Sequence, residues 1–174
     1  MVFLLKTIKP ARFKDKEFKR VLRNAVRRAG RAVIREDYEA ITEHWEHKPK
    51  IKLHTHVTAR TPSPSFDIEV EGDVWKFVNK GTKPHMIWAG IYTGKSDKKS
   101  LAFGSSHTAK TTPGVIGSRP GGSSGETVFT PYVMHPGTEP REFDKAIAKK
   151  RLPWFKRLME EAMREASRAS GHSR

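Results

Sequence analysis

Four arginines have a spacing that suits contact with a polyanion. Arg20, Arg23, Arg27 and Arg31 recur at steps of three or four residues. In a helix such steps place side chains on one face, where guanidinium groups would bind phosphates without reading a base sequence. A solvated helix face, or a face bound to an acidic protein, is the competing interpretation.

The chain also has eight histidines, which are potential metal ligands. His54 and His56 would share one face of a strand, a spacing that some zinc sites use, but no third ligand is evident. Both lie on the polar side of an alternating pattern, so we interpret them as solvent-exposed. His85 and His135 each adjoin a proline at the end of an apolar run, and we expect them to shape turns. We expect neither a metal nor a cofactor.

Motifs of known enzyme classes are missing from the sequence. The chain has no cysteine, which excludes disulfides, thiolate metal sites and a cysteine nucleophile. It has neither a GxxxxGK[ST] phosphate loop nor a strand–GxGxxG–helix unit. We therefore expect no enzymatic activity. A small metal-dependent nuclease stays open, because such enzymes need only a few Asp, Glu or His residues that the fold gathers.

Charge points to a polyanionic partner. The 174 residues include 34 Lys and Arg against 19 Asp and Glu, a net charge of +15. Residues 1–35 hold 12 basic and two acidic residues, so +10 of this charge lies in the first fifth of the chain. No window is apolar enough for a membrane span, and the apolar run at the N-terminus is too short for a signal peptide. We expect synthesis in the cytoplasm and no membrane contact.

The element that would carry the arginines is a long N-terminal helix. Residues 1–14 are expected to form a basic extended arm, because Pro10 disfavours a helix before it. From Asp15 an apolar stripe recurs at helical steps: Phe18, Leu22, Ala25, Ala29 and Val33. The register breaks near Ile34 and Glu36, where the helix would bend, and the helix should end near Trp45.

Strands are expected after this helix. Residues 51–59 alternate between apolar and polar side chains, as in a half-buried strand. The pattern of 66–81 predicts a hairpin that turns at Gly72 and Asp73. Residues 126–137 predict a last strand, and Pro131 within it favours an edge or a bulge.

The segment 93–126 differs from the rest of the chain. Gly, Ser and Thr make up 18 of its 34 residues, which favours a long flexible loop or a hairpin arm. Two small apolar islands interrupt it, with Leu101 and Phe103 in one and Val115 and Ile116 in the other. We expect these four residues to contact a neighbouring subunit during assembly.

The C-terminal helix is expected to follow a tight turn. Gly81 and Gly137 would form turns at strand ends, and Thr138 or Glu139 would cap the helix with Pro140 in its first turn. Phe143 would be the first buried anchor of this helix. Pro153 should kink or restart the helix, and the tail 170–174 should fray. The sequence thus predicts one α+β domain over 15–169. In it, a long N-terminal helix and a C-terminal helix pack on a mostly antiparallel sheet of about four strands, with a long inserted loop.

Two stretches resemble a known family. At FVNKGTKPH (77–85) and YVMHPGTEPREFDKAI (132–147) the chain resembles the tail-completion and head–tail joining proteins of long-tailed bacteriophages. These are also known as minor tail proteins. The matching residues are Phe77, Val78, Gly81, Thr82, His135, Pro136, Gly137, Pro140, Phe143 and Ile147. The order of elements is similar over about 15–165. The segment 93–126 is longer than in the family, and the basic arm is not typical of it.

The resemblance implies a structural virion protein of the phage neck or tail. Such subunits form a homo-oligomeric ring, a hexamer or dodecamer, at the head–tail junction, and double-stranded DNA passes through it. The implied partners are other copies, other neck or tail proteins, and DNA without sequence specificity. One alternative is a basic nucleic-acid-binding protein outside the virion; the small metal-dependent nuclease is another.

Overall fold

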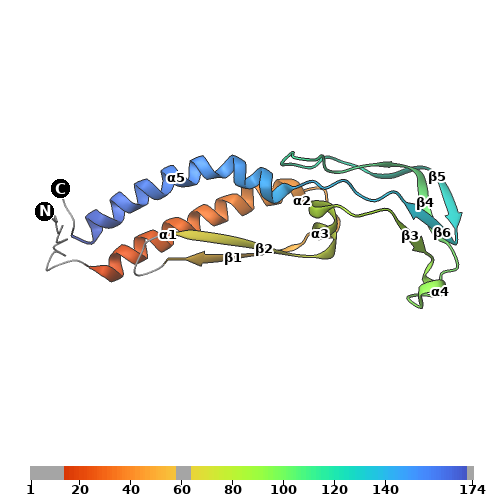
Figure 1. Ribbon diagram of the computed structural model, residues 1–174, viewed down its shortest axis with the longest axis horizontal. Helices are drawn as coiled ribbons and strands as arrows, with labels where there is room; N and C mark the ends of the chain where they lie inside the picture. The colour runs from red at the N-terminus through yellow and green to blue at the C-terminus, as the bar shows by residue number, and fades with distance from the viewer. Residues whose placement is uncertain (1–13, 58–63, 172–174) are drawn as a thin grey trace, which may run out of the picture. The chain divides into compact units, whose positions relative to one another are not determined.

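The chain is an α+β protein with small antiparallel sheets, as the sequence predicts. The computed structural model describes residues 14–57 and 64–171 (Figure 1). Three predicted segments extend beyond this description. They are almost all of the basic arm, the last two residues of the strand 51–59, and residues 172–174 of the tail.

The described residues belong to two compact units. Unit 1 takes its residues from Met1–Val33, Lys52–Glu69 and Lys150–Arg174, and unit 2 from Ile34–Ile51 and Val70–Lys149. Each unit is therefore made of separate stretches of the chain. The range 15–169, for which the sequence predicts a single domain, is divided between the two.

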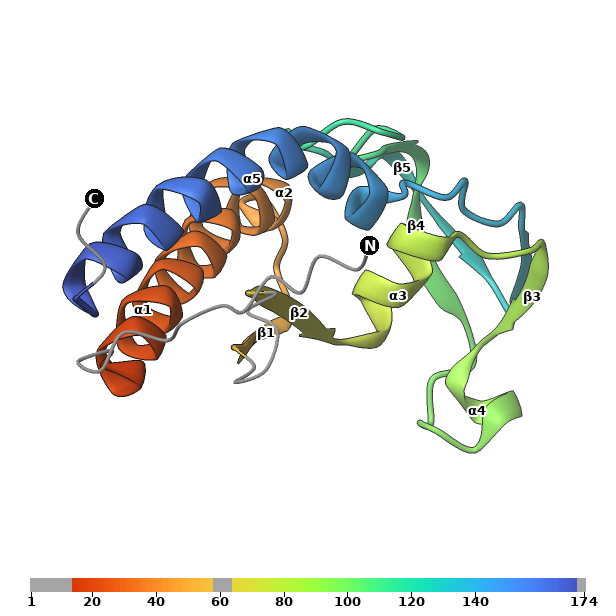
Figure 2. The same ribbon diagram turned by 60° about the vertical axis from the view of Figure 1, so that its left-hand side comes forward.

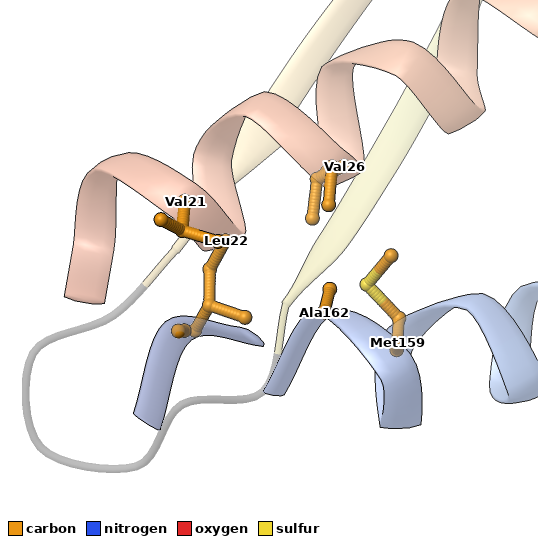
Figure 3. Close-up of a cluster of buried hydrophobic side chains, with 7 residues drawn as sticks. Val21, Leu22, Val26, Met159 and Ala162 are labelled. Atoms are coloured by element: carbon orange, nitrogen blue, oxygen red, sulfur yellow. The ribbon is translucent and has the colours of Figure 1, made fainter. Parts of the chain in front are cut away.

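Unit 1 is built around two helices, α1 (Asp15–Val33) and most of α5 (Phe143–Ala169). Helix α1 begins at the predicted residue. Figure 3 shows Val21, Leu22 and Val26 of α1 pointing toward Met159 and Ala162 of α5, and these side chains form a buried cluster. Burying an aliphatic side chain of this size contributes about 1.5–3 kcal/mol.

A two-stranded sheet completes unit 1. It pairs β1 (Lys50–His56) with β2 (Ser65–Glu71), and Phe66 lies edge-on to Phe155 of α5 with ring centroids 5.2 Å apart. Side chains along β1 alternate between exposed and half-buried, so the predicted half-buried strand is confirmed for the described residues. The alternation arises because one face of the strand is covered and the other meets solvent.

The predicted break in helical register is a π-helical turn. This turn, η1 (Ile34–Tyr38), is followed by the short helix α2 (Glu39–Thr42), which ends slightly before Trp45. Its insertion turns Asp37 and Tyr38 inward, and both are buried in unit 2.

The predicted hairpin over 66–81 is wrong in its second half. Strand β2 ends at Glu71, and the residues that were expected to return as a strand form helix α3 (Asp73–Lys80). Trp75 and Asn79 are buried, and a helix places residues four apart on the same face. The Trp75 ring packs on the rings of Tyr38, Trp45 and Phe143, at centroid distances of 5.3, 6.1 and 5.3 Å. This aromatic cluster is the core of unit 2.

Within the described residues the strands form three two-stranded sheets rather than one sheet of about four strands. In unit 2, β4 (Leu101–Thr108) pairs antiparallel with β5 (Gly122–Thr130) (Figure 2). Strand β3 (His85–Trp88) likewise pairs antiparallel with β6 (Tyr132–His135). The short helix α4 (Gly90–Thr93) follows β3. Pro131 divides the strand predicted over 126–137 into β5 and β6, because it has no N–H to donate to a ladder.

The expectation of a flexible loop over 93–126 is also corrected. This segment contains all of β4 and the first part of β5, so the hairpin alternative is the one that the structure adopts. Its connecting stretch is held by hydrogen bonds: Ser118 Oγ donates to the Ala40 carbonyl at 3.0 Å, and Gly114 N donates to the Arg141 carbonyl at 2.9 Å. A contact between this hairpin and a neighbouring subunit stays a prediction.

The two Gly-Thr-x-Pro turns of the sequence lie against each other. Thr82 N donates to the Thr138 carbonyl at 2.9 Å, and Thr138 N donates to the Thr82 carbonyl at 3.1 Å. The glycine before each threonine has a positive φ, +74° at Gly81 and +91° at Gly137. The motif repeat is therefore structural, since each copy supplies one side of a small antiparallel bridge.

Helix α5 begins later than predicted. The N–H groups of Arg141 and Glu142 donate to the carbonyls of Val78 and Asn79 at the end of α3, and Glu142 has a φ of +49°, which a helix does not allow. The first helical residue is thus Phe143, and neither Thr138 nor Glu139 is the cap.

The C-terminal end also differs from its prediction. Helix α5 continues through Pro153 as one element, so the helix does not restart there. Ser170, which the sequence places in a frayed tail, is fully buried, and its carbonyl accepts a hydrogen bond from Lys14 N at 3.0 Å.

Tyr38 gives unit 2 a predictable response to alkali. Burial raises the pKa of its hydroxyl, and the carboxylates of Asp144 and Asp37 raise it further. In the unfolded chain a tyrosine ionises near pH 10, so the stability is intact below about pH 10 and falls above it. We expect the free energy of unfolding to fall by about 1 kcal/mol between pH 10 and 11 because of this residue.

Tyr38→Phe should remove this part of the pH dependence. Denaturant unfolding of both proteins at pH 8 and pH 11 measures it. An equal loss of stability in the parent and in Tyr38→Phe would contradict the assignment.

Candidate functional site

The predicted arginine face is exposed in the structure. Arg20, Arg23, Arg27 and Arg31 all lie on the solvent side of α1, and the opposite side of the helix is buried in unit 1. Arg27 lies four residues from both Arg23 and Arg31, so neighbouring arginines of this row are about 6 Å apart along the helix axis. The helix therefore presents a row of guanidinium groups while its other side is fixed by packing.

The four arginines are not equivalent. Arg20 is paired with Glu17, and Nε of Arg20 lies 3.0 Å from Oε2 of Glu17. Hydrogen bonds from Arg20 lower the pKa of Glu17, and the same bonds raise the pKa of Arg20. Arg23, Arg27 and Arg31 have no ion-pair partner among the residues that the structure describes. Their charges are thus free to meet phosphate or carboxylate groups.

Two of the histidines pair with carboxylates across the β1–β2 sheet. Nε2 of His54 lies 3.1 Å from Oε2 of Glu69, and Nε2 of His56 lies 3.0 Å from Oδ2 of Asp67. These two pairs join the exposed faces of β1 and β2. Within 14–57 and 64–171, no group of three or more His, Asp or Glu side chains could hold a metal ion.

His85 and His135 support the strand ends, the role that their neighbouring prolines suggest. They are opposite each other in the β3–β6 register, with ring centroids 5.1 Å apart. His135 Nδ1 accepts a hydrogen bond from Gly137 N at 3.0 Å, and His85 Nδ1 lies 2.8 Å from the Lys83 carbonyl oxygen.

The predicted assembly residues do not form one surface. Leu101 and Phe103 are half-buried and line a cavity of about 620 Å³ in unit 2, together with Ile87 and Val133. In the other island, Val115 is exposed and Ile116 is half-buried, and neither lines this cavity.

A second cavity in unit 2, of about 340 Å³, is lined by several polar groups. Its lining includes Trp45, Lys110 and Arg141, and Lys110 Nζ lies 3.5 Å from Oε1 of Glu46. Nε of Arg141 is buried and has no hydrogen-bond partner in the described part of the chain. Nucleophilic catalysis by a hydroxyl needs that hydroxyl hydrogen-bonded to a base, and no described hydroxyl in this lining is hydrogen-bonded to an imidazole.

The structure reveals one surface that the sequence did not predict. Met86, Trp88, Tyr132 and Met134 share one face of the β3–β6 sheet, because Met86 pairs with Met134 and Trp88 with Tyr132. Tyr92 of α4 extends this face, with its ring centroid 6.1 Å from that of Trp88. We call these five residues the aromatic face.

Four of the five residues of the aromatic face are open to solvent, and Met86 is half-buried. The exposed fractions of the four are 46% for Trp88, 50% for Tyr132, 60% for Met134 and 61% for Tyr92. The opposite face of the same sheet presents Ile87 and Val133 to the larger cavity, and Met134 of the aromatic face also lines this cavity. The sequence signal for this surface was the density of Trp, Tyr and Met in two short apolar runs. It was not sufficient, because periodicity does not tell which face of a strand is covered.

Both surfaces are suited to binding. The arginine face offers positive charge and the aromatic face offers apolar area. No helix in the described residues is long and apolar enough to cross a membrane. No protein-family model matches the chain, and no significant match was found among curated proteins or solved structures.

Proposed function

We propose that this chain is a structural virion protein of the neck or tail of a long-tailed bacteriophage. In this proposal its copies form a ring at the head–tail junction, as a hexamer or dodecamer, and double-stranded DNA passes through the ring. The other partners are neighbouring neck or tail proteins. The protein would act by binding and assembly, without catalysis.

The arginine face of α1 is the observation that carries this proposal. One side of α1 is buried against α5 and the other presents Arg23, Arg27 and Arg31 without ion-pair partners in the described residues. Copies of such a helix arranged around a channel would multiply this charge along the DNA. Contacts with phosphates position a protein on DNA and do not read its sequence, which is what a channel requires.

The second stretch that resembles the phage proteins, residues 132–147, supports the proposal. There β6 leads into the turn at Gly137 and then into α5, the order that the family pattern implies. The first stretch departs from that pattern, because Phe77 and Val78 are on helix α3 and not on a strand. A basic nucleic-acid-binding protein outside the virion remains the alternative that the same arginine face supports.

Removing the arginine face should weaken DNA binding and its salt dependence. We expect the fourfold variant with Arg20, Arg23, Arg27 and Arg31 changed to Gln to bind double-stranded DNA more weakly. A plot of log K against log salt concentration should become shallower by about 3–4, because each phosphate contact contributes about 0.9 to the slope. Fluorescence anisotropy with a labelled duplex between 50 and 200 mM salt measures both effects.

The control removes the same charge elsewhere. Lys149, Lys156, Arg157 and Arg164 are exposed on α5, and changing them to Gln lowers the net charge by the same four units. This variant should keep most of the salt slope. An equal loss in both variants would mean that net charge, and not the α1 face, determines DNA binding.

The virion assignment has its own test. Purified phage particles should contain the protein in a fixed copy number, detectable by quantitative mass spectrometry, and particles lacking it should have unjoined heads and tails. A protein that binds DNA but is absent from particles belongs to the alternative class.

A further inference from the structure

We propose that the smaller cavity of unit 2 binds a small organic anion, in which a carboxylate or phosphate group is attached to an apolar body. The cavity has a volume of about 340 Å³, which is within the range of small-molecule sites. Its lining residues all belong to unit 2. The proposal is independent of the arginine face, because α1 contributes no residue to this lining.

The guanidinium group of Arg141 is enclosed, yet it makes no hydrogen bond to the described residues. Only 12% of the Arg141 side chain is exposed, although a guanidinium carries several N–H donors. Its ionic contact in the described part of the chain is with the largely exposed Glu139, and the 3.7 Å from Nη1 to Oε2 is too long for a hydrogen bond. An enclosed cation without hydrogen bonds is costly, so an oxyanion that accepts them from the cavity side would be bound favourably.

Lys110 supplies a second positive charge to the same lining. Its Nζ lies 3.5 Å from Oε1 of Glu46, but Glu46 is largely exposed, so water screens this pair. Arg141 lines both cavities of unit 2, whereas Lys110 lines only the smaller of the two. The smaller cavity is therefore the one that brings both cations to a single ligand.

Hydrogen bonds from distant parts of the chain hold the backbone of both cations in place. Arg141 N donates to the Val78 carbonyl at 3.1 Å, and the Arg141 carbonyl accepts from Gly114 N at 2.9 Å. The Lys110 carbonyl accepts from Arg119 N at 2.8 Å. A site fixed in this way loses less conformational entropy when a ligand binds.

Apolar side chains form the rest of the wall. Trp45, Val74, Val78 and Ala109 line the cavity. The Trp45 ring packs on Trp75, with ring centroids 6.1 Å apart, so this part of the wall is supported from behind. The lining thus suits a ligand with a charged head and an apolar or aromatic body.

Other ligand classes fit this lining less well. A metal cation would be repelled by Arg141 and Lys110, and the described residues contain no group of three or more His, Asp or Glu side chains that could hold one. A neutral molecule would leave both cations without an opposite charge. An acidic side chain of another protein offers the same oxyanion, but it would leave most of the apolar wall uncovered.

Two fluorinated probes test the site in the full chain. We expect 4-fluorobenzoate, 4-fluorophenyl phosphate or both to bind in ¹⁹F NMR titrations, and the neutral 4-fluorobenzamide to bind about tenfold more weakly or not at all. The indole N–H signal of Trp45 in an assigned ¹H–¹⁵N spectrum should shift on binding. Failure of both anions to bind, or equal binding of the amide, would overturn the proposal.

Three variants separate the site from the net charge of the protein. Arg141→Gln should weaken binding about tenfold or more, and Lys110→Gln should weaken it by a smaller factor. Lys80→Gln is the matched control, because Lys80 is exposed on α3 and lines neither cavity. An equal loss in Lys80→Gln would show non-specific attraction of anions. If Arg141→Gln does not fold, Lys110→Gln decides, and unchanged binding in that variant overturns the site.

Arg141→Met distinguishes a binding role from a structural one. This variant keeps the apolar stem and removes the guanidinium group, which has no hydrogen bond to the described residues. Without ligand it should therefore unfold at or above the melting temperature of the parent, and it should lose anion binding. A melting temperature clearly below that of the parent would make the guanidinium a structural group and would overturn the proposal.

Acetate and inorganic phosphate test the apolar part of the ligand. They carry the same charged groups without a ring, so we expect them to bind about tenfold more weakly than the fluorinated anion with the same group. Equal affinity would overturn the organic-anion assignment and indicate an acidic side chain as the occupant. A saturating fluorinated anion should leave the salt slope of DNA binding unchanged, so failure of this site leaves the arginine face standing.

Discussion

Replacing Phe143 by alanine is expected to lower the free energy of unfolding by about 3–5 kcal/mol. The Phe143 side chain is fully buried at the first residue of α5, and its ring lies 5.3 Å from that of Trp75, between centroids. Truncation removes the apolar contacts and leaves a cavity that Trp75 cannot fill, because two other rings hold it. The loss should appear in the isolated subunit, before any assembly.

Denaturant unfolding followed by near-UV circular dichroism measures this loss. Phe143→Leu keeps most of the volume and should cost less than about 1.5 kcal/mol. Phe77→Ala removes an equally large ring from the exposed side of α3 and should cost about 0.5 kcal/mol. If Phe143→Ala unfolded like the parent but failed to assemble, the segment after Gly137 would be a contact surface and not a packing anchor.

Replacing Gly137 by valine is expected to cost at least about 1–3 kcal/mol. Two effects add. The φ of +91° is unfavourable for any residue with a Cβ, and most of all for a β-branched one. A Cβ at this position would also collide with the carbonyl oxygen of Thr82, which accepts the hydrogen bond from Thr138 N. The variant should therefore disrupt the bridge between the two Gly-Thr turns.

Gly114 separates these two effects. It has a φ of +68°, and a Cβ there would have nothing within 4 Å. Gly114→Val thus carries the conformational cost, about 1–2 kcal/mol, without the collision. We expect Gly137→Val to be clearly less stable than Gly114→Val in thermal unfolding. Equal melting temperatures would show that the strands adjust around the added side chain and that the close approach is not a constraint.

Local patterns were sufficient for the elements that have one covered face. The stripe from Phe18 to Val33 predicted α1 from its first residue, and the alternation from Ile51 predicted β1. The arginine face followed from the same stripe, because residues opposite a buried face of a helix must be exposed. These predictions need only the 3.6-residue and two-residue periods of the backbone.

Short apolar runs predicted the secondary structure less well than the long periodic segments. The sequence predicts a returning strand over 74–78, where the structure has helix α3. The prediction fails because an apolar run of this length fits both periods, although Trp75 and Asn79 have helical spacing. The start of α5 was misplaced by a few residues, because it depends on hydrogen bonds from Arg141 and Glu142 to α3, which is far away in the sequence. The high Gly, Ser and Thr content of 93–126 favoured a flexible loop, although this segment contains β4 and the first part of β5.

The sequence by itself determined the α+β class, the strong positive charge, and the helix that exposes a row of arginines on one face. Only the tertiary structure decided that Leu101 and Phe103 line a cavity while Trp88 and Tyr132 are exposed. The reason is that the alternation of a strand defines two faces but does not say which one will be covered. That choice depends on the packing of β3–β6 beside residues distant in the chain, and it leaves an apolar surface that no local pattern distinguishes from a core.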